Sequence, residues 1–100
     1  MKVILCTTPK DKSEDMAQIL LEEKLVSCVN IIPAIRSIYW WNGQIQKDTE
    51  DLLIIKTKDD LVNELIEKVK EVHPYDIPEV ISLNVEDGNN DYIKWIDSIR

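Results

Sequence analysis

Three side chains in this sequence can ligate a soft metal ion. They are Cys6, Cys28 and His73, the only cysteines and the only histidine among the 100 residues. A thiolate and an imidazole together suit copper or zinc better than calcium or magnesium. No C-x-x-C or H-x-x-x-H spacing accompanies them, so the intrinsic metal signal is weak. The alternative is that both cysteines are small buried strand residues and that the histidine bonds the last carbonyls of a helix.

A second group of candidate residues lies in and near the segment Val72–Glu79. Two prolines fix the backbone of this short connection, so they hold Tyr75 and Glu79 in defined directions. Together with Lys56, at the end of a long predicted strand, these side chains predict a polar and aromatic cleft for a small anion or zwitterion. The alternative is a rigid connector in which Lys56 and Glu79 form an ordinary ion pair.

No pattern typical of catalysis accompanies these residues. Thr7 and Thr8 have no evident basic partner that would activate a hydroxyl. Glycine occurs only twice, which leaves no glycine-rich phosphate loop. A pair of catalytic carboxylates cannot be singled out either. We therefore expect a binding protein and not an enzyme.

A long β-hairpin over residues 28–57 must position most of the candidates. Asn42-Gly43 favours a two-residue type I′ turn, because both positions of such a turn need positive φ. At ~3.3 Å per residue, the arm Cys28–Trp41 would measure about 46 Å if it were straight. A compact domain of this length has a radius of gyration of about 13 Å. The ribbon must therefore bend, project, or pair with something outside its own chain.

Two features interrupt the regular pattern of the hairpin. Pro33 predicts a bulge or a break in the first arm, because proline cannot donate to a central ladder. The polar run Asp48–Asp51 lies in the second arm, and we expect regular pairing to loosen there.

Both faces of the first arm carry apolar side chains. One face has Val29, Ile31, Ile35, Tyr39 and Trp41, and the other has Cys28, Ile32, Ala34, Ile38 and Trp40. We therefore expect neither face to be fully exposed to water. Helices of the same chain are one candidate cover, but few residues are left to build them. We expect the second face to pack against another copy of the protein.

The rest of the chain alternates between strand and helix patterns. We expect strands at 3–7 and 80–85, helices carrying the stripes of residues 16–25 and 61–72, and a short terminal helix at 92–99. The order β-α-β-β-α-β predicts a single α+β domain over residues 1–100. Its architecture would be a ferredoxin-like sandwich with a long β-hairpin and a short C-terminal helix.

Local signals also predict where two of the helices begin. Asp11 with Glu14, and Thr57 with Asp60, have the spacing of capping boxes. The run of residues 88–90 predicts a turn and a cap before the terminal helix.

Charge and hydropathy narrow the class of partner. The formal net charge of −7 argues against a nucleic-acid groove and against an anionic membrane surface. No apolar run approaches the ~20 residues of a membrane span. Because Met1-Lys2 leads directly into a strand pattern, we expect no targeting segment. Two free thiols then favour a reducing compartment, and we expect the cytoplasm.

Five segments follow one another along nearly the whole chain in a specific order. They are TTP at Thr7–Pro9, CVNIIPAIRSIYWW at Cys28–Trp41, IIKT at Ile54–Thr57, HPYDIPE at His73–Glu79 and NNDYIKWI at Asn89–Ile96. Together they resemble the CutA family of divalent-cation-tolerance proteins. The resemblance implies a ferredoxin-like subunit in a tight cytoplasmic homotrimer, related in architecture to the PII signalling proteins.

The resemblance also implies a metal-binding role. Copper binding in the family is associated with a cysteine at the end of the first strand and with histidines at the HPY motif, which map onto Cys6 and His73. This chain has Val72 where some members carry a second histidine, which removes one ligand. We therefore expect copper(II) or another divalent cation to bind weakly and not to be required for folding.

Two functions are consistent with these observations. The first is a trimeric protein of divalent-cation tolerance, assembled through the long hairpin, that binds copper or another divalent metal ion. The alternative is a PII-like trimeric sensor or scaffold that holds a small ligand in inter-subunit clefts, with Lys56, Tyr75 and Glu79 as ligand-binding residues. The number of candidate metal ligands is small for a dedicated metal protein, whereas cleft residues are plentiful. Neither function involves nucleic acid or a membrane.

Overall fold

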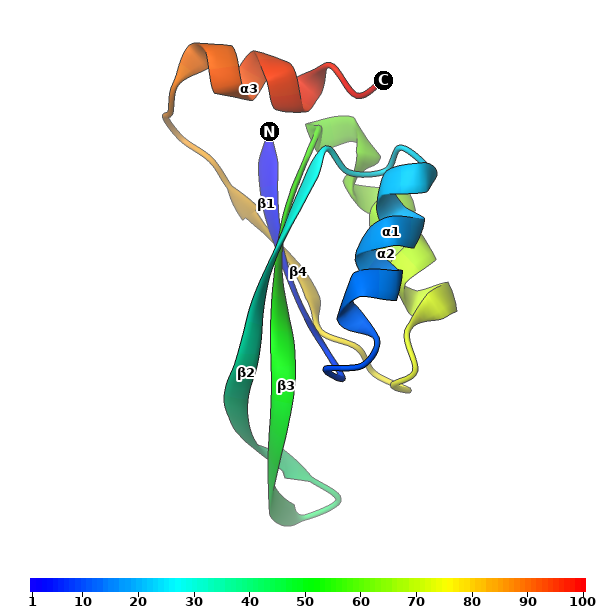
Figure 1. Cartoon of the computed structure of the whole chain (residues 1–100). Helices are drawn as coiled ribbons and strands as arrows, with labels where there is room; N and C mark the ends of the chain where they lie inside the picture. The colour runs from blue at the N-terminus through cyan, green and yellow to red at the C-terminus, as the bar shows by residue number, and fades with distance from the viewer.

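The computed structural model describes residues 1–100 and consists of one antiparallel sheet, two helices on one of its faces and a third helix at its end (Figure 1). In chain order the elements are β1 (Lys2–Thr8), α1 (Ser13–Glu22), β2 (Cys28–Trp41), β3 (Gln44–Thr57), a 3-10 turn (Asp59–Leu61), α2 (Val62–Val72), β4 (Val80–Asn84) and α3 (Asn90–Asp97). The strand order is β2-β3-β1-β4, and every neighbouring pair is antiparallel. The predicted ferredoxin-like arrangement is confirmed.

The β2–β3 hairpin projects beyond the rest of the sheet (Figure 1). Asn42 and Gly43 have φ angles of 51° and 74°, the positive values that a type I′ turn needs. β1 accompanies β3 only over residues 51–57, so the part of the hairpin between Ile35 and Glu50 has no third strand beside it. The molecule measures 45 Å along its longest axis but only 26 and 21 Å across. Of the three outcomes expected for the long ribbon, which were to bend, to project or to pair outside its own chain, the structure shows that it projects and that it bends at the register shift between Ile32 and Ile35 (Figure 1).

A β-bulge bends β2 at Pro33. The register of β2 and β3 shifts there, so that Pro33 and Ala34 face Asp51 alone. The Asp51 carboxylate accepts hydrogen bonds from the Ala34 N–H at 3.2 Å and from the Ser13 hydroxyl at 2.6 Å. These two bonds tie the bulge to the start of α1. Within the polar run at 48–51, only Asp51 lacks a paired partner in β2; the expected loosening is therefore found at Asp51 and is wrong for residues 48–50, which stay paired.

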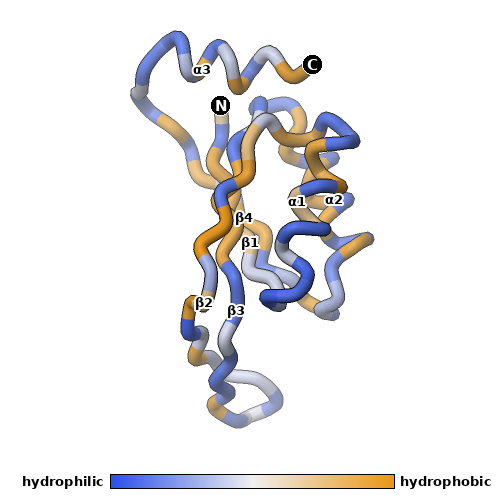
Figure 2. The backbone as a smooth tube through the Cα atoms, in the orientation of Figure 1, coloured by the Kyte–Doolittle hydropathy of each residue, from blue (hydrophilic) through white to orange (hydrophobic).

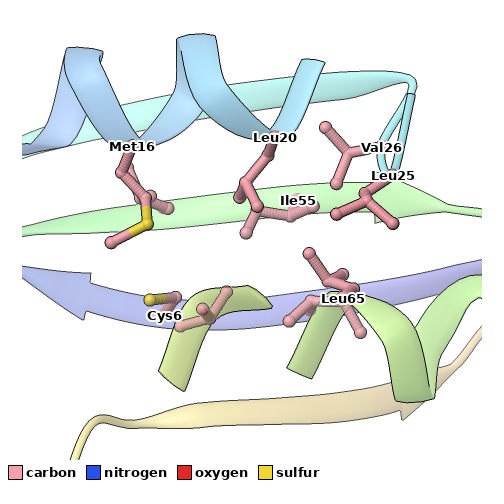
Figure 3. Close-up of a cluster of buried hydrophobic side chains, with 10 residues drawn as sticks. Cys6, Met16, Leu20, Leu25, Val26, Ile55 and Leu65 are labelled. Atoms are coloured by element: carbon pink, nitrogen blue, oxygen red, sulfur yellow. The ribbon is translucent and has the colours of Figure 1, made fainter. Parts of the chain in front are cut away.

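The hydrophobic core lies between the sheet and the pair of helices α1 and α2 (Figure 3). Its ten buried members are Ile4, Cys6, Met16, Leu20, Leu25, Val26, Leu53, Ile55, Leu65 and Val69. Successive strand residues point to opposite faces of a sheet, so alternate positions of β1 and β3 contribute to this core. The helical stripes expected from the sequence supply the other half of it.

Neither predicted capping box forms. α1 begins after Lys12, one residue later than predicted, and no side chain caps it. The Thr57 hydroxyl donates to the Leu25 carbonyl at 2.6 Å, and the 3-10 turn that precedes α2 begins after Lys58 with no side chain capping it. Tertiary contact therefore overrides the local signal at this position. At α3 the predicted cap is present, because the Asn89 side chain accepts from the Asp91 N–H at 2.9 Å.

The sheet face opposite α1 and α2 is apolar and uncovered. The register places Leu5, Ile32, Leu52, Ile54, Ile81 and Leu83 on this face. Figure 2 shows that hydrophobic residues predominate where the strands of the sheet lie side by side, whereas hydrophobic and hydrophilic residues are mixed farther along the hairpin. Near the hairpin turn, Trp40 exposes 71% of its surface. A single copy of the chain thus leaves a large part of its sheet without cover.

None of the helices has the length and apolar character needed to cross a membrane.

Candidate functional site

His73 joins the end of α2 to the end of β1. Its backbone is extended, with φ −75° and ψ 138°, as expected for a residue before proline. Nε2 lies 2.8 Å from the Thr7 carbonyl oxygen, and Nδ1 accepts from the Tyr75 N–H at 3.1 Å. A carbonyl can only accept, so the neutral ring carries its proton on Nε2. Both ring nitrogens are therefore used inside the fold.

Cys6 is fully buried in the core, beside α2 (Figure 3). Burial raises the pKa of its thiol from 9.0 to about 12, and the negative charges of Glu79 and Glu50 add to the effect. The thiol therefore keeps its proton at neutral pH, whereas metal ions bind the thiolate.

Cys6 and His73 do not form a preorganised metal site in this arrangement. Both are close to Thr7, because Cys6 precedes it and His73 bonds its carbonyl. The imidazole has no free lone pair, however, and the thiol is protonated. No group of three or more His, Cys, Asp and Glu side chains is arranged to hold a metal ion. Cys28, the third candidate, pairs with Lys56 near the other end of β3.

A cavity of about 590 Å³ lies between the hairpin and the loop that follows α2. Tyr75 and Glu79, two of the predicted ligand-binding residues, both line it. Lys56 does not, because it is six residues from Glu50 along β3, a distance of roughly 20 Å. Its Nζ donates to Oδ1 of Asn30. The structure thus brings two of the three predicted residues together and separates the third.

Aromatic side chains form part of the cavity wall. Tyr39 and Trp41 are two residues apart on β2, so the pleat puts both on the same face. Tyr75 comes from the loop after α2, and its ring lies 4.7 Å from the ring of His73. The hydroxyl of Tyr75 donates to Oε2 of Glu50 at 2.8 Å, and that of Tyr39 donates to Oδ2 of Asp48. Two tyrosines therefore hold two carboxylates in place.

Both tyrosines remain neutral donors at physiological pH. Burial raises the pKa of the Tyr75 hydroxyl well above its usual 10.0, and the hydrogen bond to Glu50 and the charges of Glu50 and Asp48 raise it further. The pKa of Tyr39 is also raised, chiefly by its hydrogen bond to Asp48.

The charge of the cavity is negative. Four carboxylates line it, those of Asp48, Glu50, Asp76 and Glu79, and no lysine or arginine does. This opposes the expectation of a small anion, which depended on Lys56 reaching the same cleft. A ligand with positive charge fits the walls better.

Glu50 is the functional candidate that the sequence did not single out. Only 6% of its surface is exposed, although its side chain is charged. It forms no ion pair with any lysine, arginine or histidine of the chain. In the sequence it belongs to the polar run at 48–51, where nothing distinguishes a buried carboxylate from exposed ones.

The fold and this cavity define a small ferredoxin-like α+β protein with a projecting hairpin. The family model described as "CutA1 divalent ion tolerance protein" matches residues 2–99. The chain belongs to the CutA1 family, as the resemblance of its motifs indicated.

Curated relatives agree with this assignment. The rice protein CutA 1, chloroplastic, is 47% identical over 95 residues, which are 94% of this chain and 54% of the rice protein. The divalent-cation tolerance protein CutA of Pyrococcus horikoshii is 42% identical, over 96% of this chain and 94% of that protein. The chain spans about half the length of the rice and mouse relatives.

Solved structures show the same fold. The divalent cation tolerance protein from Thermus thermophilus superposes with a TM-score of 0.92 at 40% identity, covering 97% of this chain and 96% of that one. The PII-like protein CutA from Nostoc gives a TM-score of 0.94 at 32% identity, covering 99% and 96%.

Proposed function

We propose that the chain is a trimeric, PII-like protein of divalent-cation tolerance that acts by binding a small ligand in the cavity beside Tyr75. The observation that carries the proposal is the cavity itself. Its volume of about 590 Å³ lies within the usual range of small-molecule sites. It combines aromatic walls with carboxylates that the Tyr39 and Tyr75 hydroxyls hold in place.

A screen of purified protein against metabolites of positive, negative and zero charge tests this function. A compound that binds the folded state raises the melting temperature by mass action. We expect at least one compound to stabilise the parent protein and to have a smaller effect on Glu50→Gln. If no compound shifts the parent, the cavity is not a ligand site.

The proposed trimer rests on the uncovered sheet face and on the projecting hairpin. Burial of apolar surface stabilises an assembly by about 25 cal/mol per Å². Ile38 and Ile45, near the hairpin turn, expose 66% and 58% of their surface, and the open face adds Ile81 and Leu83. Because the hairpin also lines the cavity, association through it would place the cavity at a subunit boundary. Lys56 could contribute to binding only at the cavity of another copy.

Weak copper binding is the second candidate function. The observation that favours it is the proximity of Cys6 and His73 to Thr7, in a family named for divalent ion tolerance. Binding would require the loss of a thiol proton and the loss of one His73 hydrogen bond. Both requirements lower the affinity, so we propose a weak site for copper(II) or another divalent cation that folding does not need.

We further propose a cytoplasmic location and a role without catalysis. Two free cysteines favour a reducing compartment. Compartments differ within the family, since the relative from Archaeoglobus fulgidus is described as periplasmic and the one from rice as chloroplastic. Cell fractionation followed by immunodetection tests the location. Because the net charge of −7 disfavours polyanionic surfaces, we propose that neither nucleic acid nor a membrane is a partner.

A further inference from the structure

We propose that the cavity beside Tyr75 selects a small organic cation, an alkylammonium ion with several carbon atoms. The inference rests on the proposed function and specifies the chemical class of the ligand.

Glu50 provides the first part of the argument. Its side chain is more than nine-tenths buried, and it lines the cavity. Oε2 accepts the hydroxyl of Tyr75, whereas no hydrogen bond within the chain reaches Oε1. Oε1 is also not among the buried polar atoms that are shut off from solvent, so it keeps a small exposed surface in a residue that lines the cavity. A carboxylate with so little contact with water and no cation beside it is poorly stabilised, and a positive ligand group would lower that cost.

The aromatic wall provides the second part. Tyr39, Trp41 and Tyr75 line the same cavity as the carboxylates. Tryptophan and tyrosine rings attract ammonium groups through their quadrupole, and this attraction extends to alkylated nitrogen. The tyrosine hydroxyls already donate their protons to carboxylates, so the rings and the hydroxyl lone pairs, both of which attract a cation, remain available to a ligand.

The spacing of the charges distinguishes an organic cation from a metal ion. Magnesium and calcium need several oxygen ligands at about 2.0 to 2.6 Å from one point. Although four carboxylates line the cavity, no three acidic, cysteine or histidine side chains are arranged to hold a metal ion. Negative charge distributed over the walls of about 590 Å³ suits a cation whose body fills space between them.

Calorimetric titration of the assembled protein at low salt tests this inference. The probes are n-butylammonium and tetramethylammonium, with n-butanol as the uncharged analogue of the first. We expect both cations to bind at least tenfold more tightly than butanol. In Glu50→Gln, which keeps the size of the side chain, we expect binding to weaken at least tenfold.

Two further variants keep the test interpretable. Glu86→Gln makes the same charge change at an exposed residue outside the cavity wall, and we expect it to bind like the parent. Trp41→Leu, at a half-exposed residue, should weaken tetramethylammonium binding and leave the fold intact. Equal binding of butylammonium and butanol, or equal loss in Glu50→Gln and Glu86→Gln, would overturn the inference.

The screen of metabolites separates this inference from the proposed function. If an anionic or neutral compound binds in a manner that depends on Glu50 while the ammonium probes do not bind, the ligand site stands and the ligand class is wrong. If no compound of any charge binds, both proposals fail.

Discussion

The Tyr75 hydroxyl lies 2.8 Å from Oε2 of Glu50, and this hydrogen bond connects the loop after α2 to the middle of β3. The two residues are 25 positions apart in the chain. His73, at the start of the same loop, bonds the Thr7 carbonyl of β1. These two hydrogen bonds attach the loop after α2 to the adjacent strands β3 and β1. They therefore position the side of the cavity that this loop forms.

The first prediction concerns this bond. Tyr75→Phe leaves the Glu50 carboxylate without a partner, so we expect the free energy of unfolding to fall by roughly 1–2 kcal/mol. A double-mutant cycle with Glu50→Gln, measured by urea denaturation, isolates the contribution of the negative charge on the acceptor, because the glutamine amide oxygen can still accept the hydroxyl. We expect Tyr75→Phe to have a smaller effect in the Glu50→Gln background. Equal effects in both backgrounds would show that the charge of Glu50 adds no stability to the bond.

The second prediction concerns the pH dependence of stability. The pKa of Cys6 is 9.0 in the unfolded chain and about 12 in the folded one. The unfolded thiol therefore loses its proton first as the pH rises. Below pH 9 the contribution of this thiol to the free energy of unfolding should be constant. Between pH 9 and about 12 the free energy of unfolding should fall, by at most about 1.4 kcal/mol per pH unit.

Comparison with Cys6→Ala isolates that contribution. The variant lacks the thiol but keeps the tyrosines, whose pKa in the unfolded chain is 10.0. We expect it to be less stable than the parent at neutral pH, because a core side chain is truncated. Its stability should then decline less steeply above pH 9, the pKa of an unfolded thiol. Parallel pH profiles for parent and variant would contradict the assignment.

The third prediction concerns assembly. Ile81 is half-exposed on the open sheet face, so we expect Ile81→Asp to leave the fold of the single chain intact. The same change should break the trimer, because a carboxylate buried in an interface lacks a partner. Light scattering should give three times the chain mass of 11.6 kDa for the parent and a lower mass for the variant.

Leu21→Asp is the matched control for assembly. Leu21 is also exposed and has the same number of side-chain atoms as Ile81, but it lies on α1, away from the open face. We expect this variant to remain a trimer. A parent protein of 11.6 kDa at micromolar concentration would show that the open face is not an interface.

The fourth prediction concerns copper. Copper titration should show weak binding to the parent and weaker binding to Cys6→Ser and His73→Ala. Protons compete for the thiolate and the imidazole, so the affinity should fall as the pH is lowered. Cys28→Ser serves as the control and should bind like the parent. Identical titrations of all four proteins would assign the metal to surface carboxylates.

Local signals were sufficient to predict several elements of the fold. The Asn42-Gly43 turn needs only the backbone freedom of two residues, and Pro33 disrupts its own ladder wherever the strand lies. The stripe of α2 and the stop before Pro74 depend on helical period and on the proline ring. Motif order was enough to indicate the CutA family, because it requires no knowledge of contacts.

Which polar groups come into contact depends on the packing of the whole chain. Thr57 has the spacing of a cap, but the Leu25 carbonyl takes its hydroxyl. Lys56 and Glu79 both lie near strand ends, yet the antiparallel course of β3 puts Lys56 roughly 20 Å away from the cavity. Glu50 is one of several acidic residues in its run, and in the folded chain it is buried and bonded to Tyr75, which lies 25 residues farther along the chain. Burial and long-range pairing are properties of the packed chain, so the local pattern of residues does not contain them.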